Sequence, residues 1–333
     1  MVDGSLMARI VITGGCGFLG QRLALALLAK RHLDLPDGTS IETSDIVLVD
    51  RPGASVVPAL DGQVTVAPVE ITDASEVAAL IDANTALVYH LAAVVSGQAE
   101  AEFDLGLTVN FDGTRNVLDA ARALGCNVPV IGTSSLAVFG GALPDVLTEA
   151  TATHPGNSYG MAKAMSEMLM SDYRRKGFAE ARTLRLPTII VRPGAPNAAA
   201  SSFASGIFRE PLMGKSSVCP VSPDLKMWLA SPKTAIAALI RAAEVPVNDW
   251  PAFSALNVPG ITASVADMLD ALETVGGAGA RARVTMKPDP KIEAIVGTWP
   301  AAFDTALADG LGFEGDSSVR EIVQRFKDGL SSG

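Results

Sequence analysis

The stretch Val11-Ile12-Thr13-Gly14-Gly15-Cys16-Gly17-Phe18-Leu19-Gly20 decides the fold of this chain. The apolar residues 10–12 predict a short buried strand, and Leu23, Leu27 and Leu28 follow at the spacing of a helix. Between the two elements, glycines at positions 14, 17 and 20 let the backbone turn sharply and approach a pyrophosphate group. A strand, a glycine turn and the N-terminus of a helix, in this order, predict a dinucleotide-binding βαβ unit.

The composition excludes several classes of protein. Of the 333 residues, 48% are hydrophobic and 19% are charged, which argues against intrinsic disorder. The net charge is −10 and no long run of Lys or Arg occurs, so nucleic acid and anionic membranes are not expected as partners. Three separated cysteines favour a reducing cytoplasm, and three separated histidines predict no metal site. No apolar run reaches the ~18 residues of a membrane-spanning helix.

Strands and helices alternate along the first half of the chain. A polar segment, residues 31–45, predicts a surface excursion after the first helix. Residues 86–91 predict a fourth strand that leads into Ala92 and Ala93, whose small side chains would let a cofactor lie against the strand end. Residues 128–132 predict a fifth strand that leads into a run of hydroxyl side chains, Thr133-Ser134-Ser135. The alternation predicts an α/β fold with a doubly wound parallel sheet, which binds ligands at the carboxyl ends of its strands.

An acidic residue, Asp50, ends the second predicted strand. Its carboxylate would accept hydrogen bonds from both hydroxyls of an adenosine ribose and repel a 2′-phosphate, which favours NAD over NADP. Arg51 follows directly and could accommodate that phosphate, so the residues alone leave the choice between the two cofactors open. After the third predicted strand, Glu70 and Ile71 are candidates for contact with the adenine.

A helix predicted from Asn157 to about Arg175 carries Tyr159 and Lys163 one turn apart on one face. A phenol ordinarily titrates near pH ~10, which is too high for a base at neutral pH. A lysine ammonium beside it, together with the positive ring of an oxidised nicotinamide, would lower the pKa of the phenol. The same ammonium could hold the nicotinamide ribose, and a serine at the end of the fifth strand could bind the oxygen of the substrate.

These motifs resemble those of the extended short-chain dehydrogenase/reductases. The glycine turn is similar to the TGxxGFxG motif of that family, and residues 90–93, 110–116 and 133–140 resemble its HLAA, NxxGTxN and SSxxV[YF]G motifs. Tyr159 and Lys163 match its YxxxK pair. The resemblance implies that Ser135 is the catalytic serine. Asn110 either supports Lys163 in a proton relay or ties two elements together.

The resemblance implies an NAD-binding Rossmann domain over residues 7–191 and a small α+β substrate-binding or lid domain over 192–330. Some segments of the second part are expected to return and pack on the first. Members of the family are frequently homodimers. The residues expected to contact NAD are Gly14, Gly17, Phe18, Leu19, Gly20, Asp50, Arg51, Glu70, Ile71, Leu91, Ala92, Ala93, Asn110, Thr133, Tyr159, Lys163, Pro187 and Thr188.

The second half of the chain bears on the substrate. Nucleotide-sugar enzymes of the family carry an R-D-[FY]-[IV]-H-V-x-D segment, whereas residues 226–232, KMWLASP, lack the arginine and both aspartates. A small acidic substrate therefore fits better, with Asn197, Ser135 and Tyr159 as contacts. Arg192 either binds the carboxylate of this substrate or belongs to an ion pair at an interface or on the surface. Residues 184–194 and 228–232 resemble in detail one dehydrogenase of the family. That resemblance implies oxidation of the 2-hydroxyl of a four-carbon sugar acid with NAD.

Two alternatives remain at this point. A nucleotide-sugar epimerase or dehydratase would share the motifs and retain its NAD. A non-catalytic regulator that senses NAD would share the glycine turn, but such a protein usually loses the tyrosine or the lysine, and both are present here.

Overall fold

A seven-stranded sheet forms the centre of the computed structural model, which describes residues 8–195, 199–252 and 255–331. All pairs of neighbouring strands in this sheet are parallel. From one edge to the other, its strands are β12 (Ala255–Asn257), β8 (Glu180–Leu186), β7 (Pro129–Ser135), β6 (Thr85–His90), β1 (Arg9–Thr13), β4 (Ile46–Asp50) and β5 (Thr65–Pro68). The predicted doubly wound α/β fold is confirmed.

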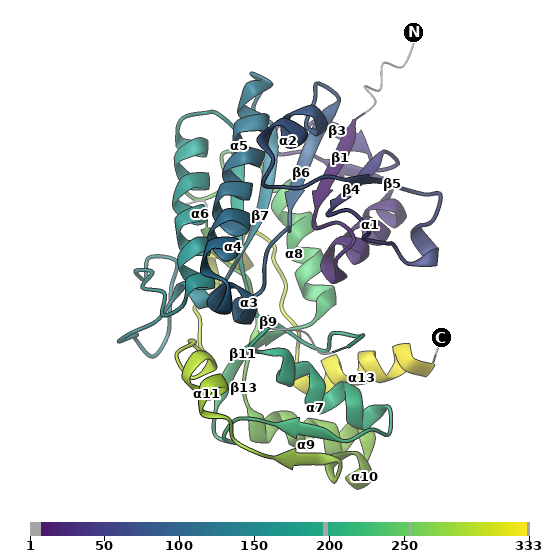
Figure 1. Ribbon diagram of the computed structural model, residues 1–333, viewed down its shortest axis with the longest axis vertical. Coiled ribbons are helices and arrows are strands. Elements are labelled where there is room, and N and C mark those ends of the chain that lie inside the picture. Colours follow the sequence, from purple (N-terminus) through teal and green to yellow (C-terminus); the bar gives the residue numbers. More distant parts are fainter. Residues whose placement is uncertain (1–7, 196–198, 253–254, 332–333) are drawn as a thin grey trace.

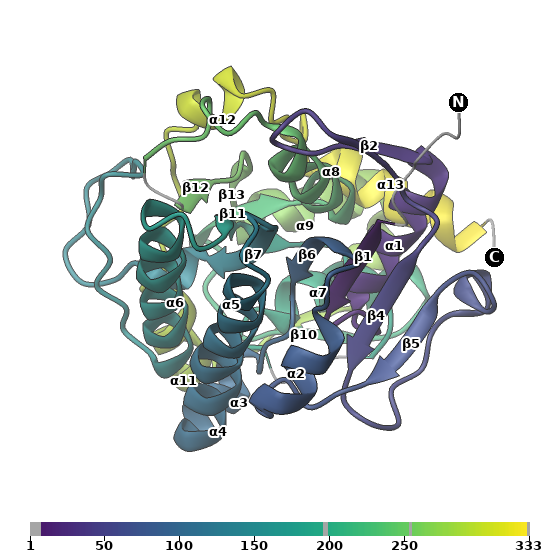
Figure 2. The same cartoon turned by 90° about the horizontal axis from the view of Figure 1, so that it is seen from above.

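Helices cover the sheet on both faces, which is why residues 10–12 of β1 and 46–49 of β4 are apolar and buried (Figure 2). Along β1, Ile10 and Ile12 pack in one apolar cluster with helices α1 (Phe18–Lys30) and α8 (Pro232–Glu244). Val11 faces the opposite way, into a cluster with the second layer of helices. That layer consists of α2 (Ala74–Leu80), α5 (Gly113–Ala123) and α6 (Ser158–Arg175).

The prediction for residues 31–45 is wrong in part. They form a hairpin of β2 (His32–Asp34) and β3 (Ser40–Glu42). Leu33, Leu35 and Ile41 are buried in the same apolar cluster as α8, so the hairpin contributes to the core, while most of its polar residues are exposed as predicted.

The second half of the chain builds a smaller apolar cluster below the sheet (Figure 1). A three-stranded sheet of β9 (Thr188–Ile189), β11 (Lys226–Ala230) and β13 (Ile261–Ser264) leads into it. Its main helices are α7 (Ser202–Leu212), α9 (Val265–Gly276) and α13 (Val319–Ser331), and β10 (Ser217–Cys219) pairs with β14 (Val284–Met286). The remaining elements are α3 (Ser96–Ala101), α4 (Phe103–Leu107), α10 (Ala278–Arg281), α11 (Pro290–Val296), α12 (Ala306–Gly310), a π-helical turn (Thr108–Asp112) and 3-10 turns at Pro58–Leu60 and Leu136–Val138.

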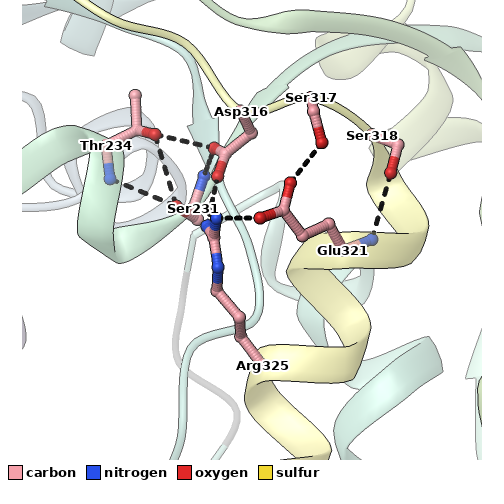
Figure 3. A network of polar contacts seen from close by, with 7 residues as sticks. All are labelled: Ser231, Thr234, Asp316, Ser317, Ser318, Glu321 and Arg325. Atoms are coloured by element: carbon pink, nitrogen blue, oxygen red, sulfur yellow. Dashed lines mark hydrogen bonds and ion pairs between the residues drawn. The ribbon is translucent and has the colours of Figure 1, made fainter.

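A polar network joins the two halves (Figure 3). The buried carboxylate of Asp316 accepts hydrogen bonds from the backbone N–H of Ser231 at 2.6 Å and from the hydroxyl of Thr234 at 2.9 Å, both at the start of α8. Arg325 of α13 forms an ion pair with the other oxygen of Asp316 at 2.8 Å. The N-terminus of α8, which packs on the main sheet, is thereby linked to α13 in the second cluster.

Within the described residues, no helix is long and apolar enough to cross a bilayer.

A close contact fixes the start of α6 against the end of β7. Asn157 caps the helix, because its side-chain oxygen accepts a hydrogen bond from the backbone N–H of Gly160 at 2.8 Å. A Cβ atom on Gly160 would lie 2.0 Å from the carbonyl oxygen of Ala137, in the turn that follows β7. Only glycine therefore lets the helix approach this turn so closely.

We predict that Gly160→Ala destabilises the protein by about 2 kcal/mol, because the added methyl group must push α6 away from the backbone of Ala137. The midpoint of urea unfolding should fall accordingly. Gly156→Ala is the matched control, since a Cβ atom at Gly156 meets nothing within 4 Å. Equal unfolding midpoints for the two variants would show that the contact does not constrain the helix.

Candidate active site

A cavity of 370 Å³ lies at the carboxyl edge of the main sheet. Its walls come from the glycine turn, from the segments that follow β6, β7 and β8, and from α6 and α7. The predicted site residues that line it are Gly14, Gly17, Phe18, Leu19, Gly20, Leu91, Ala93, Thr133, Ser135, Tyr159, Lys163, Pro187, Thr188 and Arg192. The structure thus brings together the motifs that the sequence separates.

The predicted contacts for the adenosine end lie outside this cavity. Asp50 ends β4 and accepts a hydrogen bond from the backbone N–H of Cys16 at 3.1 Å, so its carboxylate lies against the glycine turn. Arg51 and Glu70 are exposed. Ile71 and Ala92 pack against the apolar cluster that contains Val11. Asn197, a predicted substrate contact, lies outside the described residues.

The glycine turn has the shape that a pyrophosphate needs. Gly14 has a φ of +66°, and a Cβ atom there would lie 2.7 Å from the backbone nitrogen of Ala92, so a larger residue would fill the turn. Gly17 begins α1 without a side-chain cap. The first N–H groups of this 13-residue helix therefore remain available to an anion, and the positive end of the helix dipole points the same way. These residues fit a dinucleotide.

Tyr159 and Ser135 face each other across the end of β7. Burial raises the pKa of the Tyr159 phenol to about 12, while the positive charge of Arg192 and a hydrogen bond with Ser135 lower this pKa. The ammonium of Lys163 lies 5.9 Å from the centre of the Tyr159 ring. The protein alone thus holds the phenol protonated at neutral pH, and further positive charge is needed before it can act as a base.

Lys163 is buried, with its Nζ donating a hydrogen bond to the carbonyl oxygen of Thr133 at 2.7 Å. Burial lowers the pKa of Lys163 to about 8, and the negative charge of Glu167 opposes this shift. Glu167 is itself held in an ion pair with Arg185 at 2.8 Å. Nearby, burial and then the charge of Lys163 lower the pKa of His90 to about 3, so its ring is neutral.

Asn110 is fully buried on the π-helical turn before α5. Its side-chain oxygen accepts a hydrogen bond from the backbone N–H of Val94 at 2.7 Å, and its Nδ2 donates to the carbonyl oxygen of Val94 at 3.0 Å. Its own carbonyl oxygen accepts from the Ser166 hydroxyl of α6 at 3.1 Å. Asn110 therefore connects the loop after β6 to α6 and to the π-helical turn that leads into α5.

The far end of the cavity contains residues that the sequence did not indicate. Ser205 and Arg209 of α7 and Trp299 after α11 line it together with Arg192. The guanidinium of Arg192 makes no hydrogen bond or ion pair with the residues that the structure describes. Burial lowers the pKa of Arg192, and the charge of Arg209 adds to this effect. Ser205, Arg209 and Trp299 belong to no sequence motif, and only the fold of the second half places them in the cavity.

Comparison with known proteins shows that residues 10–228 match the model of the NAD dependent epimerase/dehydratase family. D-erythronate dehydrogenase from Cupriavidus necator is 46% identical over 317 residues, which cover 95% of this chain and 97% of that protein. The enzyme of the same name from Haemophilus influenzae is 41% identical over 96% of this chain and 98% of its own length.

Solved structures agree with this assignment of the fold. A structure described as a nucleoside-diphosphate-sugar epimerase from Agrobacterium tumefaciens has a TM-score of 0.89 and 36% identity, and the match covers 100% of this chain and 98% of that one. L-threonine 3-dehydrogenase from Trypanosoma brucei has a TM-score of 0.84 and 25% identity, over 95% of each chain.

The pKa of Lys163 predicts a pH dependence of stability. Because the folded protein lowers this pKa from 10.5 to about 8, the unfolded chain binds more protons between these pH values, and stability should rise as the pH rises. Without cofactor, the free energy of unfolding should increase between pH 7 and 10 by about 2 kcal/mol more in the wild type than in Lys163→Met. Urea unfolding measures this difference. Lys176→Met is the control, because it changes an exposed lysine after the same helix and should behave as the wild type. The same pH dependence of the free energy of unfolding in wild type and Lys163→Met would refute the lowered pKa of Lys163.

Proposed function

Because this chain belongs to the NAD dependent epimerase/dehydratase family and is an NAD-dependent dehydrogenase that acts on a CH–OH group, we propose that it oxidises the 2-hydroxyl of D-erythronate to the 2-oxo acid. Two D-erythronate dehydrogenases that match it over nearly their full length support this substrate. The observation that carries the proposal is the cavity itself, in which Tyr159, Lys163 and the unpaired cation of Arg192 line one space.

Tyr159 is the general base of the proposed reaction. Its phenolate takes the proton of the substrate hydroxyl, and Ser135 donates a hydrogen bond to the same oxygen. Bound NAD would supply the acceptor for the hydride of the carbon that carries this oxygen, so the products would be the 2-oxo acid, NADH and one proton. Lys163 keeps two N–H groups besides the one that it donates to Thr133, and these hold the nicotinamide ribose. Its charge, together with that of Arg192, favours the phenolate.

The remaining predicted residues divide between holding NAD and supporting the site. The glycine turn and the start of α1 would hold the pyrophosphate, Asp50 would bind the adenosine ribose with Arg51 beside it, and Glu70 and Ile71 would contact the adenine. Leu91, Ala93, Thr133, Pro187 and Thr188 line the cavity and would face the nicotinamide, and Ala92 would support this wall from the apolar cluster behind it. We assign Asn110 to the tie between the loop after β6 and α6, because its amide is already bonded to Val94 on both sides.

Arg192 is the proposed binding group for the substrate carboxylate. A guanidinium offers two parallel N–H groups to a carboxylate, and in a partly dry cavity such a pair is stronger than in water. Arg192 and Tyr159 line the same cavity, and the positive charge of Arg192 lowers the pKa of Tyr159. A hydroxyl next to the carboxylate therefore reaches the phenol, which favours a 2-hydroxy acid.

A nucleotide-sugar epimerase is the second candidate, because a structure with that description matches the whole chain. The two candidates differ in what happens to the cofactor. An epimerase returns the hydride to its substrate and retains NAD, whereas a dehydrogenase accumulates NADH from free NAD. The absence of the arginine-led segment at residues 226–232 supports the dehydrogenase.

We predict that the protein forms NADH from D-erythronate and free NAD, followed by absorbance. Tyr159→Phe should lower kcat/KM about a thousandfold, because the base is lost, while NAD binding measured by calorimetry is retained. Tyr173→Phe is the matched control, since Tyr173 lies on the same helix but outside the cavity, and its hydroxyl donates to Asp119 at 2.5 Å. Turnover by Tyr159→Phe would contradict the mechanism. The absence of NADH with every C3 to C6 sugar acid would contradict the function.

The protein is further proposed to be a cytoplasmic homodimer. Cys16, Cys126 and Cys219 are all free thiols, as a reducing compartment allows. Helices α4 and α6 contact each other and carry exposed apolar side chains, Phe103 at 50% and Met168 at 65% of full exposure. Covering them against a second copy would remove these side chains from water.

Sedimentation should therefore give about twice the chain mass of 34.4 kDa. The double variant Phe103→Lys with Met168→Lys should shift the protein to monomer, because two charges would be buried in the interface. Val57→Lys changes a residue of similar exposure away from these helices and should leave the mass unchanged. A wild type that sediments as a monomer would rule out the dimer.

A further inference from the structure

Two side chains of α7 hold the backbone of Arg192 from opposite sides. The hydroxyl oxygen of Ser205 accepts a hydrogen bond from the backbone N–H of Arg192 at 3.0 Å. Nη1 of Arg209 donates a hydrogen bond to the carbonyl oxygen of Arg192 at 2.9 Å. Ser205 and Arg209 are four residues apart, so they lie on one face of the helix. Their exposure is 1% and 3%, which means that water cannot replace either bond.

Arg209 is itself fixed in place. Its Nε and Nη2 both donate to one oxygen of Glu210, at 3.1 and 2.5 Å. This pairing leaves Nη1 directed at the backbone of Arg192. It also restricts the motion of the Arg209 guanidinium. The backbone of Arg192 is thus attached to a buried helix, while its own guanidinium stays unpaired within the described part of the chain.

The charges in this arrangement point to an anion. Arg192 and Arg209 repel each other, and the charge of Arg209 adds to burial in lowering the pKa of Arg192. Glu210 neutralises one of the two cations, so one positive charge remains uncompensated in a partly buried cavity. Such a charge destabilises the protein alone but favours a bound carboxylate.

We propose that Ser205 and Arg209 are positioning residues that fix Arg192 in the place where it binds the carboxylate of the substrate next to Tyr159. This inference rests on the proposed function of the cavity. Neither residue touches the reacting atoms. Both act through Arg192, so their effects must disappear when the guanidinium of Arg192 is absent.

A double-mutant cycle tests this dependence. Ser205→Ala removes one hydrogen bond and should raise KM for D-erythronate about fivefold, and Arg192→Met should raise it about fiftyfold. In the Arg192→Met background, Ser205→Ala should change KM by less than about twofold. Ser205→Ala should also move the rising limb of the kcat–pH profile to higher pH, because Arg192 then lowers the pKa of Tyr159 less. Ser217→Ala, in the neighbouring strand β10, is the control and should change neither quantity.

Arg209 supplies a second variant pair. Arg209→Met should raise KM at least as much as Ser205→Ala, and Arg209→Lys, which keeps one donor and the charge, should restore part of the affinity. A merely structural role would lower the unfolding midpoint without this partial rescue. Equal and additive effects of Ser205→Ala in both backgrounds would overturn the proposal.

Binding of tartronate, a hydroxy dicarboxylate, to the protein loaded with NADH gives a readout without turnover, because NADH cannot accept a hydride. Calorimetry should show the Kd raised about fivefold by Ser205→Ala and about fiftyfold by Arg192→Met, with no further loss in the double variant. If tartronate binds in this pattern while no sugar acid is oxidised, the proposed function fails and the positioning role stands. If D-erythronate is oxidised but the pattern is additive, only the positioning role fails.

Discussion

Two contacts between α6 and the end of β7 determine where Tyr159 and Lys163 lie. Gly160 rests on the carbonyl of Ala137 with no room for a methyl group, and Lys163 donates to the carbonyl of Thr133 at 2.7 Å. The first contact sets how close the helix comes, and the second sets how it is rotated. Together they turn Tyr159 toward the carboxyl edge of the sheet, onto which the glycine turn already opens.

The charges around the cavity determine which ligands it favours. Lys163, Arg192 and Arg209 bring three cations to a cavity of 370 Å³, and carboxylates balance them only in part. Burial lowers the pKa of Lys163 and of Arg192, which shows that the protein alone carries an electrostatic cost. The same excess of positive charge favours three anionic groups: a phenolate, a pyrophosphate and a carboxylate. The cavity is therefore suited to anions before any of them arrives.

Local patterns in the sequence predict the fold and the family, whereas NAD-dependent dehydrogenase activity is shown by the similarity to known dehydrogenases. The glycine turn, the strand–helix alternation and the YxxxK pair each depend on neighbours within a few residues, so a linear reading captures them. Residues 31–45 show the opposite case. Leu33, Leu35 and Ile41 become core residues only because α8, far along the chain, returns to the same face of the sheet, and no local signal reports that return.

Ser205 and Arg209 were invisible in the sequence for a related reason. An arginine in an amphipathic helix has the pattern of a surface residue, and its burial arises only when α7 packs against the segment that follows β9. The first half of the chain thus carries the motifs that the family shares, whereas contacts in the second half hold Arg192, the proposed carboxylate-binding group. Since α7 holds Arg192 by its backbone, changes on this helix can alter the preference for an acid while Tyr159 and its neighbours remain in place. That separation lets one catalytic centre serve different substrates.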